Sequence, residues 1–300
     1  MTFELGINTC FAVKRWPRPD EWAQIVADEL GLGVVQHSLD LVDLAAPDEA
    51  VHAQAVGARE ACARAGIAIH STFTGLVAYS SNLMLDPDAD ARRRAEAWYE
   101  RAIGFTAQLG AARAGGHVGS LSRADAADPA RRGRLWSELR GALDRLSRVA
   151  RTAGLQGLLV ENMACAREPS RMDELRDLLS VGDGDRVPVE LCLDVGHQCV
   201  PGTIGEERDP YAWLSRLGDR AAVVHLQQTD ADGDHHWPFT AEFNALGRID
   251  AEQVLEALGA TRPTLILEII PTFEADDERV LAELKETVVH GRRALADSRL

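Results

Sequence analysis

The sequence lacks several features that identify common classes of protein. It contains no run of ~18 apolar residues that could cross a membrane. The start, MTFELGINTC, has no basic segment followed by an apolar one, so we expect no signal peptide. The five cysteines form no CxxC pair and are odd in number, which argues against a disulfide framework or a zinc finger. We therefore expect a cytoplasmic protein that does not associate with membranes.

Basic residues are also scarce. The chain has 32 Lys and Arg residues against 47 Asp and Glu residues, which gives a net charge of −15. Such a surface repels nucleic-acid phosphates and anionic lipids, so neither is an expected partner. Only Lys14 and Lys285 are lysines, and Lys285 falls in the final helical pattern. An enzyme that depends on a Schiff-base lysine is therefore nearly excluded.

Short apolar runs alternate with longer segments of helical period along the whole chain. The eight apolar runs are residues 4–10, 34–41, 67–72, 111–118, 158–163, 189–195, 221–227 and 264–270. The clearest helical segments are residues 48–65, 89–109, 134–153 and 276–297. Eight strand–helix units predict a single (β/α)₈ barrel domain over residues 1–300, since such a barrel needs ~250 residues. A doubly wound open sheet is the alternative, but no GxGxxG or GxxxxGK[ST] motif supports it.

Two predicted strand-to-helix loops are longer than a bare barrel needs. They span residues 75–90 and 229–250, and the second contains an aspartate, two adjacent histidines and a tryptophan. Active sites of such barrels lie at the end of the barrel that carries these loops. We therefore expect both loops, and the second above all, to contribute to function.

Ionisable residues end four successive predicted strands in the second half of the chain. They are Glu161 in GLLVENM, Asp194 in VELCLDVGH, His225 in AAVVHLQQ and Glu268 in TLILEII. In a barrel these side chains would meet at one rim, where three buried carboxylates would repel one another. A divalent cation resolves that repulsion, so the series predicts one metal ion. The ligand types suit Mn²⁺, with Mg²⁺ or Co²⁺ as alternatives and Zn²⁺ less typical.

This series, together with DVGH at 194–197, resembles the xylose isomerase-like superfamily of sugar isomerases and epimerases. The resemblance extends from the NTC run at 8–10 to the last helix. It implies that the four residues bind one metal and that Glu161 and Glu268 also act as acid and base on a ketose. It further implies that His197 holds a substrate hydroxyl.

Two shorter segments resemble the catalytic subunits of C-glycoside deglycosidases. They are GGHVGSLS at 115–122 and HLQQTD…HHWPF at 225–239. In that family a 3-oxo sugar loses its C-linked aglycone by proton abstraction and elimination, and a small second subunit completes the enzyme. The resemblance implies that His117 is the base.

Further side chains are candidates for substrate binding. His70 and His117 each end a predicted strand, so both are expected at the same rim. Gln227 and His236 lie in the segment that follows His225. Trp237 could stack on a sugar ring or simply anchor its loop, and the neighbouring His235 shares these alternatives. The remaining histidines lie away from the series and are expected to be structural or exposed: His37, His52 and His290.

The favoured function is therefore a metal-dependent sugar isomerase or epimerase. Proton removal next to a metal-chelated carbonyl gives an enediolate, from which epimerisation, isomerisation or elimination can follow. The alternatives are the deglycosidase lyase, a three-metal DNA-repair endonuclease, which the negative charge disfavours, and a sugar-binding barrel without turnover. We expect a homo-oligomer, with or without a small second subunit.

Overall fold

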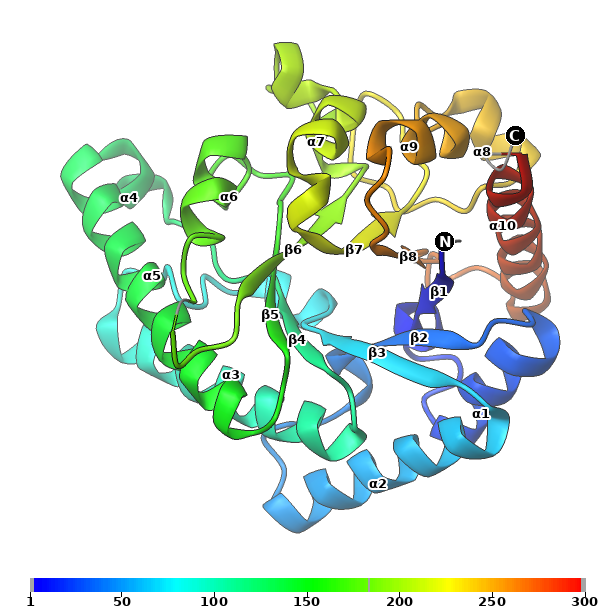
Figure 1. Cartoon of the computed structure of the whole chain (residues 1–300), viewed down its shortest axis with the longest axis horizontal. Coiled ribbons are helices and arrows are strands. Elements are labelled where there is room, and N and C mark those ends of the chain that lie inside the picture. Colours follow the sequence, from blue (N-terminus) through cyan, green and yellow to red (C-terminus); the bar gives the residue numbers. More distant parts are fainter. Residues whose placement is uncertain (1–2, 183, 298–300) are drawn as a thin grey trace. The chain divides into compact units, whose positions relative to one another are not determined.

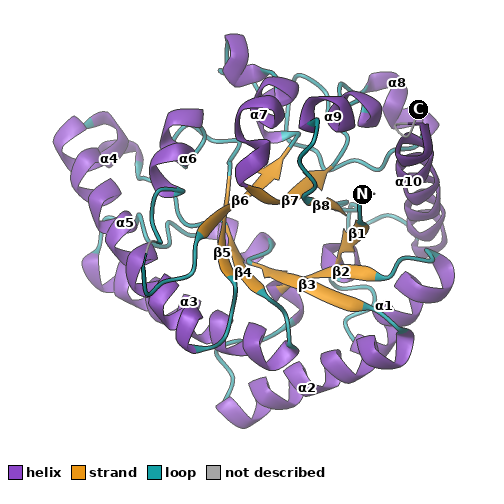
Figure 2. Ribbon diagram, in the orientation of Figure 1, coloured by secondary structure: helices purple, strands orange, loops and turns teal. Residues whose placement is uncertain are grey.

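Eight parallel strands form a closed barrel in chain order (Figure 2). This computed structural model describes residues 3–182 and 184–297. The strands are β1 (Leu5–Asn8), β2 (Val34–Ser38), β3 (Ala68–Phe73), β4 (Arg113–Gly116), β5 (Gly157–Glu161), β6 (Val189–Asp194), β7 (Ala221–Leu226) and β8 (Thr264–Leu267). Each strand overlaps one of the eight predicted apolar runs, so the predicted (β/α)₈ barrel is confirmed.

Helices follow the strands. They are α1 (Pro19–Gln24), α2 (Asp48–Ala65), α3 (Ala89–Leu109), α4 (Arg123–Ala127), α5 (Pro129–Thr152), α6 (Met172–Leu178), α7 (Pro210–Leu217), α8 (Ala241–Leu246), α9 (Ala251–Leu258) and α10 (Asp277–Asp297). Short 3₁₀ or π turns are η1 (Thr9–Ala12), η2 (Ile25–Glu29), η3 (Leu39–Leu41), η4 (Leu76–Ser80), η5 (His197–Cys199), η6 (Gly205–Arg208) and η7 (Gly218–Arg220). None of these described helices is long and apolar enough to cross a membrane.

The residues group into two compact units. The first unit comprises the chain up to Gln36, residues Ala61–Ala68, and the chain from Cys192 onward. The second unit comprises His37–Glu60 and Ile69–Leu191. The expectation of one domain over residues 1–300 stays a prediction.

In the first unit, strands β7, β8, β1 and β2 pair side by side (Figure 2). The register places Ile7 opposite Leu267 and Asn8 opposite Gln36. Helices α7 and α9 lie next to each other outside these strands (Figure 1). Helix α9 begins where the Asp250 side chain accepts hydrogen bonds from two backbone N–H groups of its first turn. The pairing brings the carboxyl ends of β1 and β8 together, where polar residues follow the apolar ones.

In the second unit, β3, β4 and β5 pair, with Phe73 opposite Gly115 and Gly115 opposite Leu159. Helices α3 and α5 pack against each other (Figure 1). Helix α5 starts five residues before the predicted segment because Pro129 suits its first turn and Asp128 caps it. This sheet segment positions the residues that follow β4 and β5.

Candidate metal centre

Two of the predicted ligands meet directly in the first unit. His225 lies in β7 and Glu268 directly follows β8, and both side chains are buried. His225 Nδ1 is 2.8 Å from Glu268 Oε2. No described residue donates a hydrogen bond to that Oε2 atom. A buried carboxylate oxygen is costly without a partner, so this arrangement fits two ligands of one cation.

The third predicted ligand, Asp194, ends β6 and accepts hydrogen bonds from three N–H groups. Its Oδ1 accepts hydrogen bonds from the backbone N–H of Gly196 (2.6 Å) and His197 (3.0 Å) and from Gln227 Nε2 (3.0 Å). A Cβ atom on Gly196 would lie 2.5 Å from Gln227 Cδ, so the close approach of this glutamine requires glycine. The DVG sequence thus fixes the orientation of the carboxylate.

The fourth predicted ligand, Glu161, ends β5 in the second unit. Tyr79, in η4, donates a hydrogen bond to Glu161 Oε2 at 2.7 Å. The Tyr79 ring also stacks on His117, with 4.9 Å between ring centroids and 14° between planes. Two residues that the sequence assigns to catalysis are therefore linked by one tyrosine from the predicted 75–90 loop.

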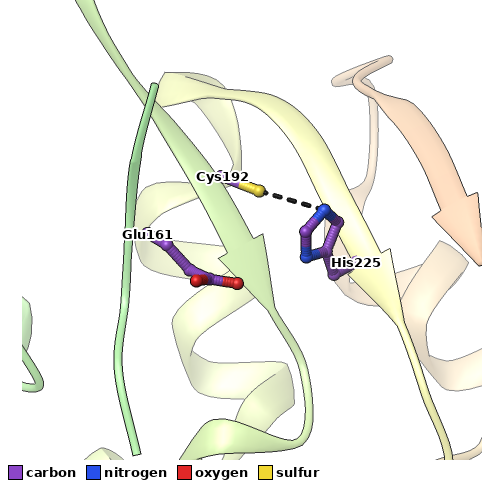
Figure 3. Close-up of side chains that lie close together, drawn as sticks. All are labelled: Glu161, Cys192 and His225. Atoms are coloured by element: carbon purple, nitrogen blue, oxygen red, sulfur yellow. Dashed lines mark hydrogen bonds between the residues drawn. The ribbon is translucent and has the colours of Figure 1, made fainter. Parts of the chain in front are cut away.

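Three of the predicted ligands form one candidate metal-binding cluster within the first unit. The ligand atoms of Asp194, His225 and Glu268 lie within 4.8 Å of one another, and all three side chains are buried. The sulfur of Cys192 is 3.3 Å from His225 Nε2 (Figure 3). Two buried carboxylates this close repel one another unless a cation lies between them. The donor set therefore fits a divalent metal ion.

The charge state of Glu268 also suits a metal ligand. Burial raises the pKa of Glu268, but the charges of His225 and His236 outweigh burial and keep the pKa below its usual range. A carboxylate must be ionised to bind a metal ion. Glu268 meets that requirement at neutral pH.

An aspartate that the sequence analysis did not single out joins two of the predicted substrate-binding histidines. Asp234 Oδ2 is 3.1 Å from His197 Nε2, and Asp234 Oδ1 is 3.3 Å from His236 Nε2. Burial lowers the pKa of His236, but the charge of Asp234 raises it to about 9. His236 is thus an imidazolium at neutral pH. Its Nδ1 atom lies 3.5 Å from Glu268 Oε2. A second group of possible ligands consists of Asp194, His197 and His236.

Gln227 connects this group to Asp194 of the candidate metal-binding cluster. Its Nε2 donates to Asp234 Oδ1 at 2.7 Å as well as to Asp194, and its Oε1 accepts from the His236 backbone N–H at 2.7 Å. His236 adopts a left-handed backbone conformation with φ of 50°. That conformation is uncommon for a residue other than glycine, and it places the imidazole within reach of Asp234.

Comparison with known proteins identifies the family of the chain. A family model described as "xylose isomerase-like TIM barrel" matches residues 57–287. The chain belongs to this family.

Two relatives share nearly the full length of this xylose isomerase-like chain. D-erythrulose 1-phosphate 3-epimerase of Brucella abortus (strain 2308) is 28% identical over 299 residues, which cover 96% of this chain and 95% of the relative. The crystal structure of a candidate xylose isomerase of Rhodospirillum rubrum ATCC 11170 is 35% identical, with a TM-score of 0.91, and covers 97% of this chain and 99% of that one.

A third relative was studied with a metal salt. A protein of Thermus thermophilus, soaked with ZnCl₂, is 25% identical with a TM-score of 0.64, and covers 99% of this chain and 98% of that one. The sequence-based resemblance to the xylose isomerase-like superfamily is confirmed.

One placement expected within this family barrel is wrong. His70 does not end β3, because the strand continues to Phe73. The next residue, Ser71, pairs with Arg113, the first residue of β4, so His70 lies toward the amino end of the strands. Burial, together with the charge of Arg113, lowers the pKa of His70 to about 4. Contact of His70 with substrate stays a prediction.

Trp237 is held within its own loop. Its ring stacks on His235 with 4.1 Å between centroids and on Phe243 with 5.0 Å. Its backbone exchanges two 2.9 Å hydrogen bonds with Gln228. This packing favours the loop-anchor interpretation, and stacking of Trp237 on a sugar stays a prediction.

His117 follows two glycines at the end of β4. Gly116 has φ of 132°, and a Cβ atom there would lie 2.5 Å from Thr74 Oγ1 and 2.7 Å from the Phe73 ring. The backbone N–H of His117 donates to the same Thr74 Oγ1 at 3.0 Å. The GGH sequence is thus required for the chain to pass this close to β3 and present the histidine.

Proposed function

We propose that this chain is a divalent-metal-dependent sugar isomerase or epimerase that removes a proton next to a carbonyl group. The observation that carries the proposal is the buried cluster of two carboxylates and one imidazole, Asp194, Glu268 and His225, at successive strand ends. The buried Glu161, at the end of β5, is proposed as the third carboxylate. The similarity to a curated ketose-phosphate 3-epimerase over almost the whole chain supports the same class of chemistry. We propose a ketose, with or without a phosphate group, as the substrate class.

The proposed metal ligands are Glu161, Asp194, His225 and Glu268. Their mixture of oxygen and nitrogen donors favours Mn²⁺ over Ca²⁺, with Mg²⁺ or Co²⁺ as alternatives and Zn²⁺ less typical. When bound, the ion would polarise the substrate carbonyl and so make the neighbouring proton more acidic.

Glu161 and Glu268 are also the proposed acid and base. One carboxylate would remove the proton beside the carbonyl, and the other would return a proton from the opposite face, which inverts the configuration. Tyr79 donates to one oxygen of Glu161, and Asn8 Nδ2 donates to one oxygen of Glu268. In each carboxylate the protein thus fixes one oxygen and thereby the direction of the other.

Three further side chains would bind substrate hydroxyl groups. His197, Gln227 and His236 gather around Asp234, and all three are buried. Because His236 is charged at neutral pH, it can donate a strong hydrogen bond to an oxygen that gains negative charge.

The alternative function is the catalytic subunit of a C-glycoside deglycosidase. The observation that favours it is the buried His117 imidazole, which stacks on the tyrosine that bonds to Glu161. In this alternative His117 would remove the proton, and the aglycone would leave with the electrons of its bond to the sugar. A small second subunit would complete the enzyme.

Proton exchange in D₂O tests the proposal and separates the alternatives. The protein is incubated with Mn²⁺ and a panel of ketoses and ketose phosphates, beginning with D-erythrulose 1-phosphate, and separately with a 3-oxo C-glycoside. We expect epimerisation with deuterium at the inverted carbon, loss of activity in EDTA and recovery with Mn²⁺. Release of an aglycone without epimerisation of any ketose would refute the epimerase and support the lyase.

The variant His117→Ala sharpens this comparison. If the two glutamates are the acid and base, exchange at the carbon next to the carbonyl should stay within about tenfold of wild type and KM should rise. If His117 is the base, its loss should lower turnover by ~10²–10⁴-fold while the metal still binds.

We also propose that the protein acts in the cytoplasm as a homo-oligomer. The large net negative charge supports the absence of nucleic-acid partners. Size-exclusion chromatography with light scattering would measure the oligomeric state, and a monomer would refute this part.

A further inference from the structure

The buried amide of Asn8 has a defined orientation. Asn8 ends β1, and its Oδ1 accepts a hydrogen bond from the backbone N–H of Cys10 at 2.9 Å. Its Nδ2 donates to Gln36 Oε1 at 2.9 Å and to Glu268 Oε1 at 3.1 Å. The two hydrogens of the amide thus meet two acceptors, and its oxygen meets a donor. Rotating the amide by 180° would place its oxygen against two acceptors and its NH₂ group against a donor, so all three hydrogen bonds would be lost.

The orientation of Asn8 determines that of Gln36. Gln36 lies opposite Asn8 in the register of β1 and β2, and the oxygen of its amide must face the Asn8 donor. The same Gln36 Oε1 is 2.6 Å from His225 Nε2. An amide oxygen accepts and never donates a hydrogen bond, so Nε2 of His225 must carry the hydrogen.

The hydrogen on Nε2 has a consequence for the other side of the imidazole ring. In a neutral imidazole with hydrogen on Nε2, the lone pair is on Nδ1. Nδ1 is the nitrogen that lies 2.8 Å from Glu268 Oε2. The chain of hydrogen bonds therefore leaves Nδ1 of His225 facing the carboxylate oxygen. Without a metal ion Nδ1 can carry a hydrogen toward that oxygen, and a cation that replaces this hydrogen would meet the nitrogen lone pair and the carboxylate together.

We propose that Asn8 and Gln36 are positioning residues that prepare His225 and Glu268 to bind the metal ion. Gln36 fixes the ring nitrogen that faces the ion, and Asn8 orients both Gln36 and the Glu268 carboxylate. Neither residue is a proposed ligand. This inference rests on the metal site of the proposed function and extends it to two residues that lie outside the ligand set.

The burial of these residues supports a role beyond packing. Asn8, Gln36 and His225 are each 0% exposed, and Glu268 is 2% exposed. Apolar residues would fill this part of the barrel at lower cost, because a buried polar network stabilises only when every member is satisfied. The network joins residues of β1, β2 and β7 and the residue that follows β8 through four hydrogen bonds or close contacts.

Metal affinity in the absence of substrate provides the first test. Mn²⁺ binding to metal-free protein is measured by isothermal titration calorimetry for wild type, Gln36→Met and Asn8→Asp. Methionine has a length similar to that of glutamine but no oxygen acceptor, and aspartate has the shape of asparagine but no donor. We expect the Kd of each variant to rise by about 10- to 100-fold, the usual effect of losing a residue that orients a ligand.

Two controls separate positioning from general damage. Gln36→Glu keeps an oxygen that can accept from His225 Nε2, so its Kd should lie much closer to wild type than that of Gln36→Met. Gln228→Met removes another buried glutamine, which bonds to the backbone of Ile249 instead, and it should lower the unfolding temperature without changing the Kd. A Kd for Gln36→Met within twofold of wild type would overturn the proposal.

A measurement on the wild-type protein keeps the proposal testable even if a variant does not fold. Long-range ¹H–¹⁵N NMR of the Mg²⁺-loaded protein, with His225 assigned by comparison with His225→Gln, reports which ring nitrogen carries the hydrogen. We expect hydrogen on Nε2 and none on Nδ1, and the opposite result would refute the inference. If wild type binds no divalent ion, the proposed metal site fails as well. If it binds tightly but the variants are unaffected, only the positioning role fails.

Discussion

Replacing Asp234 by asparagine tests the electrostatics of the histidine pair beside the proposed metal site. Asp234 Oδ1 lies 3.3 Å from His236 Nε2, and Asp234 Oδ2 lies 3.1 Å from His197 Nε2. Burial alone would lower the pKa of His236, but the charge of Asp234 raises it from 6.5 to about 9. Asparagine has nearly the same shape without the charge. We therefore expect the pKa of His236 to fall to 6.5 or below in Asp234→Asn.

The sign and size of the effect on stability follow from this pKa. Because the folded-state pKa of His236 lies above its unfolded value, protonation stabilises the folded protein. That contribution is fully present below pH 6.5 and is lost as the pH rises through about 9. The rise in pKa corresponds to about 3 kcal/mol. Since 23% of the Asp234 side chain is exposed, water screens the pair, and we expect about 2 kcal/mol.

Urea unfolding in EDTA, at about pH 6 and about pH 10, measures this contribution. The difference in unfolding free energy between wild type and Asp234→Asn should be about 2 kcal/mol larger at the lower pH. Asp230→Asn is the matched control, because Asp230 pairs with His235 at 3.0 Å in the same loop but near the surface. The effect of Asp230→Asn on the unfolding free energy should change by less than about 1 kcal/mol between about pH 6 and about pH 10. If the unfolding free energies of wild type and Asp234→Asn differed by the same amount at both pH values, the reasoning would be refuted.

Four further substitutions, at three residues, have defined outcomes. Asp194→Asn should abolish Mn²⁺ binding in calorimetry, with little loss of unfolding free energy in the metal-free protein. Asp194→Ala should lower the metal-free unfolding free energy by about 2 kcal/mol, because buried donors such as the Gly196 N–H lose their acceptor. Tyr79→Phe should lower kcat by about 10- to 100-fold, since a hydrogen bond to a charged group such as Glu161 is worth ~1.5–3 kcal/mol. An unchanged kcat would contradict the proposed role of Tyr79. Burial lowers the pKa of His37 to about 4, so its neutral form stabilises the folded protein above pH 6.5 and this contribution is lost as the pH falls through about 4. In urea unfolding, His37→Phe should reduce the loss of unfolding free energy at acid pH. An unchanged dependence of the unfolding free energy on pH would contradict this prediction.

The strands could be predicted because a barrel strand is apolar on both faces. GLLVE of β5 and VELCLD of β6 are short and largely buried, and each ends in a charged residue at the rim. His70 was misplaced because the apolar pattern of IAIHSTF does not show where the strand ends. Only the pairing of Ser71 with Arg113 shows that the histidine lies toward the other end.

The 75–90 loop shows why irregular segments were less predictable. Its start is held by Asp40, whose carboxylate accepts hydrogen bonds from the backbone N–H groups of Leu76 and Val77 at 2.7 and 2.9 Å. Gly75, with φ of 75°, makes the turn before η4 and leaves room for that carboxylate. A contact across more than thirty residues of chain leaves no local pattern. The position of Tyr79 therefore could not be derived from the sequence.

The charged residues of the proposed metal site stand out in the sequence, whereas the neutral residues proposed to orient them do not. A carboxylate at the end of an apolar strand is conspicuous because burial of a charge needs an explanation. Asn8 and Gln36 are neutral, so nothing in the sequence sets them apart from other strand-end amides. Their role depends on the register that places them opposite each other, and on which end of each amide faces the neighbour.

The two networks around the proposed metal site orient two different imidazole rings. Through Gln36, the neutral amides place a hydrogen of the His225 ring on Nε2 and leave Nδ1 facing Glu268. Through Asp234, a carboxylate instead favours a second hydrogen on His236, 3.5 Å from the same Glu268 oxygen. One histidine is thus prepared to bind a cation and the other to donate hydrogen bonds to anionic oxygen. The proposed function, in which a metal ion and a sugar carbonyl would bind side by side, would use both kinds of imidazole, and the amide or carboxylate behind each ring would provide them.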